Sequence, residues 1–236
     1  MQPICAPCFL LTNATHGTII ILRRTRLDRG DSRKELNMKE RISTRTLTGV
    51  ALFTAIVVVL QFLGAFIRFG PFSISLVLIP IVVGAALYGA GAGAWLGFVF
   101  GLVVLLSGDA AAFLVVNPLG TLVTVLVKGT MAGLCAGLVF KALEKRSSTV
   151  AVILAALTAP VVNTGLFLLG CLCFFMPTIT EWGKAAGFEN VGAYMIIGFV
   201  GLNFLFEVLV NVVLAPVIVR LIKLGRHSDS SKRSGQ

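Results

Sequence analysis

Apolar runs separated by short polar or basic segments fill the chain from Leu47 onward. Each run holds about 20 residues, which is long enough for a helix to cross a hydrocarbon core of roughly 30 Å. The pattern therefore predicts an all-α integral membrane protein with six transmembrane helices. The expected helices cover residues 47–66, 72–88, 91–107, 118–143, 149–176 and 193–222.

Glycine, proline and asparagine mark the junctions between these helices. The glycine-rich stretch YGAGAG is the only break between the second and third runs, so the chain is expected to turn back there. Asn117 and Pro118 favour a helix start, because asparagine caps free amides and proline fits the first turn. Glycines spaced four residues apart predict close approach of helix backbones at Gly89, Gly93, Gly97 and Gly101 and at Gly133 and Gly137.

Basic residues between the apolar runs indicate the orientation, because lysine and arginine are retained on the cytoplasmic side. They gather before the first helix, between the fourth and fifth, and after the sixth: Lys39, Arg41, Arg45, Lys141, Lys145, Arg146, Arg220, Lys223, Arg226, Lys232 and Arg233. The opposite segments hold only Arg68 and Lys184. Both termini are therefore expected in the cytoplasm, with residues 66–72, 107–118 and 177–192 outside.

Composition agrees with a membrane protein and excludes several functions. The chain is 57% hydrophobic and 13% charged, with a mean hydropathy of +0.96, whereas a soluble domain carries roughly 25% charged residues. A net charge of +10 would suit nucleic-acid binding, but the lysines and arginines flank the apolar runs. We therefore expect that the chain does not bind nucleic acid.

Sequence motifs of common enzymes and metal sites are missing. Walker A, HExxH and GxSxG motifs are absent, and Cys5 and Cys8 form a lone CxxC pair. We expect neither an enzyme nor a metal or cofactor site.

The first 37 residues differ from the rest, since they are rich in arginine and lack a spanning apolar run. Met38 opens MKERISTRT directly before the first helix, so residues 1–37 are expected to be a poorly ordered or spurious extension. A disordered basic arm or a targeting segment is the alternative. Residues 38–226 would then form the six-helix membrane domain, and residues 227–236 a basic cytoplasmic tail.

Polar side chains are few within the expected helices, where a charged residue costs about 2.5–3.5 kcal/mol on insertion scales. Lys128 lies about 15 Å along its helix at 1.5 Å per residue, and Glu207 lies at a similar depth. The amide residues of these helices are Gln61, Asn163, Asn203 and Asn211. One interpretation is a pocket in which Lys128 meets a substrate anion. The other is that Lys128 and Glu207 neutralise each other while the amides tie helices together.

Trp182 is the aromatic residue that we include in the candidate site. It stands in an expected outer segment beside Glu181 and Lys184, where it could stack on a ring of the ligand. Tryptophan also anchors proteins at membrane surfaces, and that interpretation competes for Trp182.

From Met38 to about Arg226 the chain resembles the substrate-specific S component of an energy-coupling factor (ECF) vitamin transporter, of the pantothenate and riboflavin group. Ala51 and Ala55 match the AxxxA motif of that family in helix one. The stretch SISLVLIPIVVGAALYGAGAGAWLGFVFGL is similar to its second and third helices, and NPLGTLVTVLVKG is similar to its fourth.

The resemblance implies a substrate-binding subunit in the bacterial cell membrane that captures a vitamin from outside and topples to release it inside. Ala51 and Ala55 would dock on a transmembrane T component that couples to two ATPases. The implied pocket lies among helices four to six, with Lys128, Asn163, Asn203 and Glu207. A cation at the depth of Lys128 suits a carboxylate such as pantothenate, with riboflavin next. Alternatives outside the family are a self-contained carrier or channel and a structural protein of envelope assembly.

N-terminal sequencing of the natural protein tests the expected start. We predict that the first residue found is Met38, because MKERISTRT places a short basic segment directly before the first apolar helix. Finding Met1 would contradict this prediction and favour the basic arm or the targeting segment.

Overall fold

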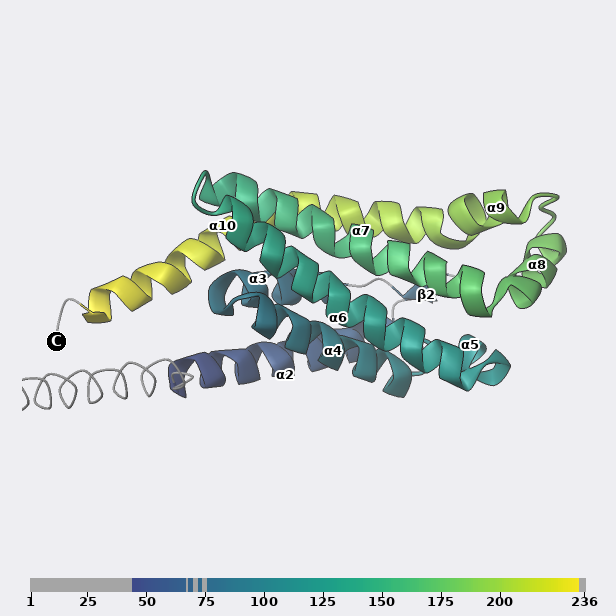
Figure 1. Cartoon of the computed structure of the whole chain (residues 1–236), viewed down its shortest axis with the longest axis horizontal. Helices are drawn as coiled ribbons and strands as arrows, with labels where there is room; N and C mark the ends of the chain where they lie inside the picture. The colour runs from purple at the N-terminus through teal and green to yellow at the C-terminus, as the bar shows by residue number, and fades with distance from the viewer. Residues whose placement is uncertain (1–43, 67, 70–71, 74–75, 234–236) are drawn as a thin grey trace, which may run out of the picture. The chain divides into compact units, whose positions relative to one another are not determined.

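The computed structural model of the chain describes residues 44–66, 68–69, 72–73 and 76–233 (Figure 1). Residues 1–37 and Met38, which carry the predictions about the start, lie outside this part. The elements in order are α2 Thr44–Phe66, β1 Arg68–Phe69, β2 Phe72–Ser73, α3 Leu78–Tyr88, α4 Ala90–Leu106, α5 Ala111–Val116, α6 Pro118–Leu143, α7 Ser148–Phe174, α8 Met176–Ala185, α9 Val191–Ala193, η1 Tyr194–Gly201 and α10 Leu202–Arg233.

Helices make up nearly all of the described chain, which confirms the all-α prediction. Three of them are long and apolar enough to cross a membrane: α2, whose apolar part runs from Thr46 to Ala65, α6 and α7. Helices α3 and α4 are apolar but shorter. The C-terminal segment begins as a π-helix, η1, and continues as α10 to Arg233, so residues 227–233 of the expected tail are helical.

The second helix begins later than predicted. We expected a helix from residue 72, but Phe72 and Ser73 form β2, which pairs antiparallel with β1, and α3 starts at Leu78. The two strands flank Gly70 and Pro71 in the sequence, residue types that favour turns over helix. Two segments expected as loops also hold short helices, α5 within 107–118 and α8 within 177–192.

Helix α3 is the central helix of the bundle. Every residue from Pro80 to Ala86 is buried, and α3 packs against α4, α6, α7 and α10. With 11 residues it spans about 16 Å, only half of a hydrocarbon core. Because its neighbours are other helices, α3 is surrounded by protein along most of its length.

The turn between α3 and α4 depends on one glycine. Gly89 has a φ of 95°, a left-handed conformation that residues with a Cβ rarely adopt. Its amide donates to the carbonyl of Ala85 at 2.9 Å, which closes α3. The predicted reversal at YGAGAG is confirmed, and it takes place at this residue.

Helices α4 and α6 meet backbone to backbone along the predicted rows of glycine. Gly93 faces Gly133, and Gly97 faces Gly129 so closely that a methyl group on either would collide with the carbonyl oxygen of the other. A methyl group on Gly101 would lie 2.8 Å from the Val125 carbonyl. Because lipid chains are as apolar as side chains, such close packing replaces the hydrophobic effect as the force that joins these helices.

We predict that Gly97→Ala lowers the stability of the protein by about 1–3 kcal/mol, because the added methyl group has no room and must push α4 away from α6. Thermal unfolding in mild detergent measures the change. Gly91→Ala is the matched control in the same helix, since a Cβ there meets open space. It should leave stability unchanged or raise it by up to about 1 kcal/mol. Equal behaviour of the two variants would contradict the role assigned to Gly97.

Candidate functional site

Polar side chains from four elements are buried within the helical bundle. Gln61 on α2, Asn163 on α7 and Glu207 on α10 are each less than one-tenth exposed, and Lys128 on α6 is half-buried. Asn211, one turn beyond Glu207, is buried as well. The backbone of Asn203 belongs to α10, but its side chain lies outside the part of the chain that the structure describes.

Lys128 is held between an aromatic ring and acidic groups. Its Nζ lies 4.8 Å from the ring centroid of Phe167 on α7, within the range of a cation–π contact. The charges of Glu207 and Asp109 both act on it. The charges of Lys128 and Glu207 therefore act on each other, which the second interpretation of the sequence requires and the first allows.

Gln61 is fixed by an acid that we did not include in the predicted site. Its Nε2 donates a hydrogen bond to Oδ2 of Asp109, which lies between α4 and α5. This bond ties the C-terminal half of α2 to the same acid that acts on Lys128. A glutamine within an otherwise apolar helix needs a polar partner, but nothing in the sequence indicated that this partner is Asp109.

Three buried acceptors on α6, α7 and α10, the helices that carry Lys128, Asn163 and Glu207, have no hydrogen-bond donor among the described residues. They are Oγ1 of Thr124, Oδ1 of Asn163 and Oδ1 of Asn211. Leaving a buried acceptor unsatisfied costs about 1–3 kcal/mol, so such groups occur mostly where a water, an ion or a ligand supplies the missing hydrogen bond. Hydroxyl, amine or amide groups of a ligand would satisfy these oxygens.

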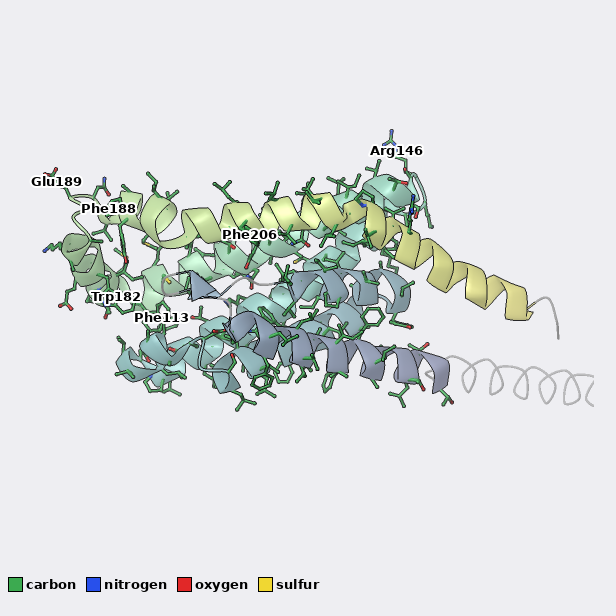
Figure 2. The ribbon with its side chains drawn as sticks, turned by 180° about the vertical axis from the view of Figure 1, so that it is seen from behind. Phe113, Arg146, Trp182, Phe188, Glu189 and Phe206 are labelled. Carbon is green, nitrogen blue, oxygen red and sulfur yellow. The ribbon has the colours of Figure 1, made fainter. Side chains whose placement is uncertain are left out.

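An aromatic cluster adjoins Lys128 through Phe167. The Phe113 ring on α5 lies edge-on to Phe167, Phe175 and Trp182, with centroid distances of 5.6, 5.0 and 5.7 Å. Trp182 is half-buried on α8 rather than in a loop, and Figure 2 shows it next to Phe113 at the end of the molecule formed by α5 and α8. Sequence reasoning missed this cluster because its members are spread over three helices.

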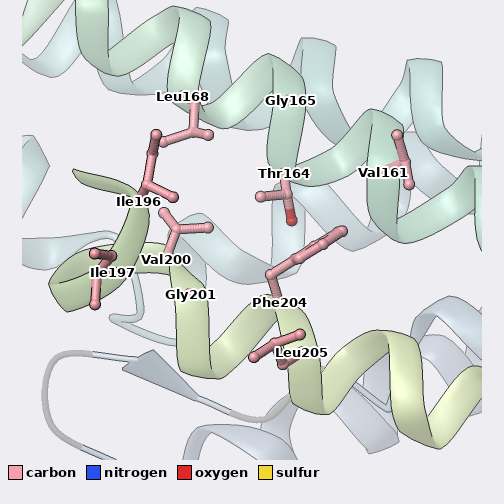
Figure 3. A pocket seen from close by; sticks show the side chains of 10 residues that line it. All are labelled: Val161, Thr164, Gly165, Leu168, Ile196, Ile197, Val200, Gly201, Phe204 and Leu205. Carbon is pink, nitrogen blue, oxygen red and sulfur yellow. The ribbon is translucent and has the colours of Figure 1, made fainter. Parts of the chain in front are cut away.

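A separate hollow of about 680 Å³ lies between α7 and the segment formed by η1 and α10 (Figure 3). Its described lining residues are apolar apart from the Thr164 hydroxyl, with Phe204 and Leu168 among the side chains that face it. Lys128, Asn163 and Glu207 do not line this hollow. Among the described lining residues none carries a charge that could meet an anion.

Comparison with known families decides the class of this protein. A model of the family described as the ECF transporter, substrate-specific component, matches residues 45–219, most of the chain. The chain belongs to this family. Neither the curated proteins nor the solved structures give a match. The protein is therefore an S component, a multi-pass protein of the cell membrane that binds a transport substrate and is not an enzyme. Its family works with a T component and ATPases.

The predicted docking residues of the S component lie on α2. Ala51 and Ala55 are both exposed, and among the long apolar helices α2 is the least buried. Its contacts with the bundle include Gln61, the edge-on packing of Phe53 on Tyr88, and the bond from Trp95 Nε1 to Oγ1 of Thr54 at 3.3 Å. The exposed face leaves room for a partner helix, and the docking role of Ala51 and Ala55 remains a prediction.

We predict that Gln61→Leu destabilises the S component by about 1–3 kcal/mol, because Asp109 loses a hydrogen-bond donor in a partly buried position. Thermal unfolding in detergent measures the loss. Asp109→Asn serves as the comparison, since its side-chain carbonyl still accepts from Gln61, and its loss should be smaller. Wild-type stability of Gln61→Leu would show that this bond does not hold α2.

Proposed function

We propose that this S component captures a vitamin-like molecule from outside the cell, with pantothenate as the first candidate and riboflavin as the second. The observation that supports the proposal most directly is the cation of Lys128, which is half-buried against Phe167 and feels the charge of Glu207, together with three unsatisfied acceptors on α6, α7 and α10. In this proposal Lys128 binds the carboxylate, and Asn163 and Asn203 bind hydroxyl and amide groups. Gln61 and Trp182 complete the site from α2 and α8.

Glu207 gives the site a built-in competitor for the ligand. In the empty protein its carboxylate offsets the charge of Lys128, which lowers the cost of burying a cation in the bilayer. A ligand carboxylate would take over part of that role. The pair thus combines both interpretations drawn from the sequence, since it neutralises itself when empty and opens for an anion.

Riboflavin is the second candidate because of the aromatic cluster. A flat ring system gains about 0.5–1.5 kcal/mol beyond its area burial from each well-placed aromatic neighbour. Trp182, Phe113 and Phe167 offer such neighbours beside the polar residues. Recognition of riboflavin would depend on these rings and much less on the charge of Lys128.

The proposed topology has six spans with both termini in the cytoplasm. Helices α3 and α4 and the segment of η1 and α10 would add three crossings to α2, α6 and α7. The basic residues at the α6–α7 turn and on α10 support this orientation. The exposed face around Ala51 and Ala55 would then dock on the T component within the membrane, and two ATPases would drive release of the vitamin inside.

The first experiment is mass spectrometry of small molecules released from the S component after purification in mild detergent, with and without incubation in a vitamin panel. We expect pantothenate, or else riboflavin, to be retained. Retention of a different vitamin would correct the substrate and leave the class intact. Retention of nothing from the whole panel would contradict the proposed cargo.

Two charge-removing variants then test how the cargo is held. For a carboxylate ligand, Lys128→Gln should weaken binding by about 10- to 100-fold, the value of one charge-assisted hydrogen bond. Glu207→Gln should strengthen it, because the competitor for Lys128 is gone. Lys184→Gln, at an exposed position on α8, is the control and should bind as the wild type does. Unchanged binding in Lys128→Gln together with lowered stability would show that the pair is only structural.

The same assay separates the two candidate vitamins. If riboflavin is the cargo, Trp182→Leu should weaken binding more than Lys128→Gln does. The opposite order is expected for pantothenate.

A further inference from the structure

A second cavity opens where the first turns of α7 meet the middle of α10. Its volume is about 350 Å³. The walls are apolar, from Ile153, Val212, Pro216 and Val219, and the polar groups at its rim are Thr149 and Arg220. Arg220 is exposed, so its guanidinium is available at the end of an otherwise apolar slot.

The surrounding charges are mostly positive. The last turn of α6 and the turn that follows it carry Lys141, Glu144, Lys145 and Arg146, with one acid among three bases, and Figure 2 shows Arg146 pointing away from the ribbon at this turn. The rim of the cavity therefore lies in a basic region, and an anionic group is favoured there.

The backbone adds to this preference for an anion. Helix α7 begins at Ser148, and Ser147 caps it by accepting a bond from the Val150 amide at 3.5 Å. The amides of the first helical residues, Thr149 among them, have no partner within the helix, and the helix dipole places positive potential at this end.

We infer that this cavity binds an anionic phospholipid, with part of an acyl chain against Ile153 and Val219 and the phosphate at Arg220 and the start of α7. The inference depends on the proposed orientation, which places this end in the cytoplasmic leaflet, where anionic lipids are concentrated. It does not depend on the proposed cargo. It goes beyond the transport function, because the site lies on the outside of the α7–α10 pair and not among the residues around Lys128.

The shape and charge together select this ligand over other occupants. A partner helix is 10–12 Å wide with its side chains and needs a long groove, whereas this cavity holds about 350 Å³. A zwitterionic lipid would fill the apolar walls equally well but would gain less from the basic rim. A soluble anion would gain from the rim and leave the walls empty.

Native mass spectrometry of the full chain, released from nanodiscs of equal parts phosphatidylglycerol and phosphatidylcholine, tests the inference. We expect the wild type to retain phosphatidylglycerol preferentially. Arg220→Gln should lower that preference about fivefold, because a basic residue near an anionic surface contributes about 1 kcal/mol. The control Lys184→Gln removes an exposed base at the other end of the molecule and should retain the lipid normally.

A second pair of variants tests the apolar slot without changing charge. Val212→Trp should fill the cavity and reduce retention of phosphatidylglycerol by a similar factor. Val213→Trp is its control, since Val213 is 63% exposed on the same helix and does not line the cavity. Equal retention of the two lipids, or equal loss in a variant and its control, would overturn the inference. Vitamin retention measured on the same samples tests the cargo separately.

Discussion

The contact between α4 and α6 determines where the functional groups of this S component lie. Gly97 and Gly129 allow the two backbones to touch, and a lipid environment supplies no hydrophobic force that could replace such a contact. Helix α6 uses this face for α4 and the neighbouring face for α7, where Thr124 packs on Gly170 and Lys128 on Phe167. The packing of α6 on α4 thus fixes the position along the bundle and the direction of the polar groups on the face of α6 that meets α7.

Burying polar side chains inside the bundle costs free energy, and the S component buries more of them than helix packing requires. Glu207 and Lys128 offset each other, and Gln61 is bonded to Asp109. Thr124, Asn163 and Asn211 still present acceptors that no described donor reaches. A purely structural network would satisfy those oxygens, because each costs stability. Unsatisfied acceptors are expected in a protein that binds a transport substrate, because the substrate can supply the missing donors in the bound state.

Much of the fold could be predicted from the sequence because apolar length and junction residues are local signals. Helix α6 begins and ends at the predicted residues, since Asn117 and Pro118 define its start and the basic turn its end. The rows of glycine predicted a real contact. The late start of α3 could not be seen, because Phe72 and Ser73 join a strand pair that depends on a partner across the turn.

The candidate site was harder to predict, since its members meet only through tertiary packing. Lys128, Glu207 and Gln61 were visible as polar residues in apolar helices. Asp109 and the ring cluster around Phe113 were not, because acids and aromatic residues in expected loops are common and carry no sign of their partners. The π-helical start of the last span also escaped, because its residues are as apolar as those of an ordinary helix.

That π-helix has a consequence for how the last span is built. Each α-helical residue turns the chain by about 100°, so the wider turn of η1 behaves as one residue inserted into the span. It lets Met195 and Val200 both face inward, while Ile196 and Ile197 lie exposed. Loss of a single residue here would return the segment to an α-helix and rotate everything before it, including Tyr194 against Gly183, without altering the composition of the span. A change in sequence length, rather than in residue type, is thus a simple route by which relatives could present a different surface beside the same helical bundle.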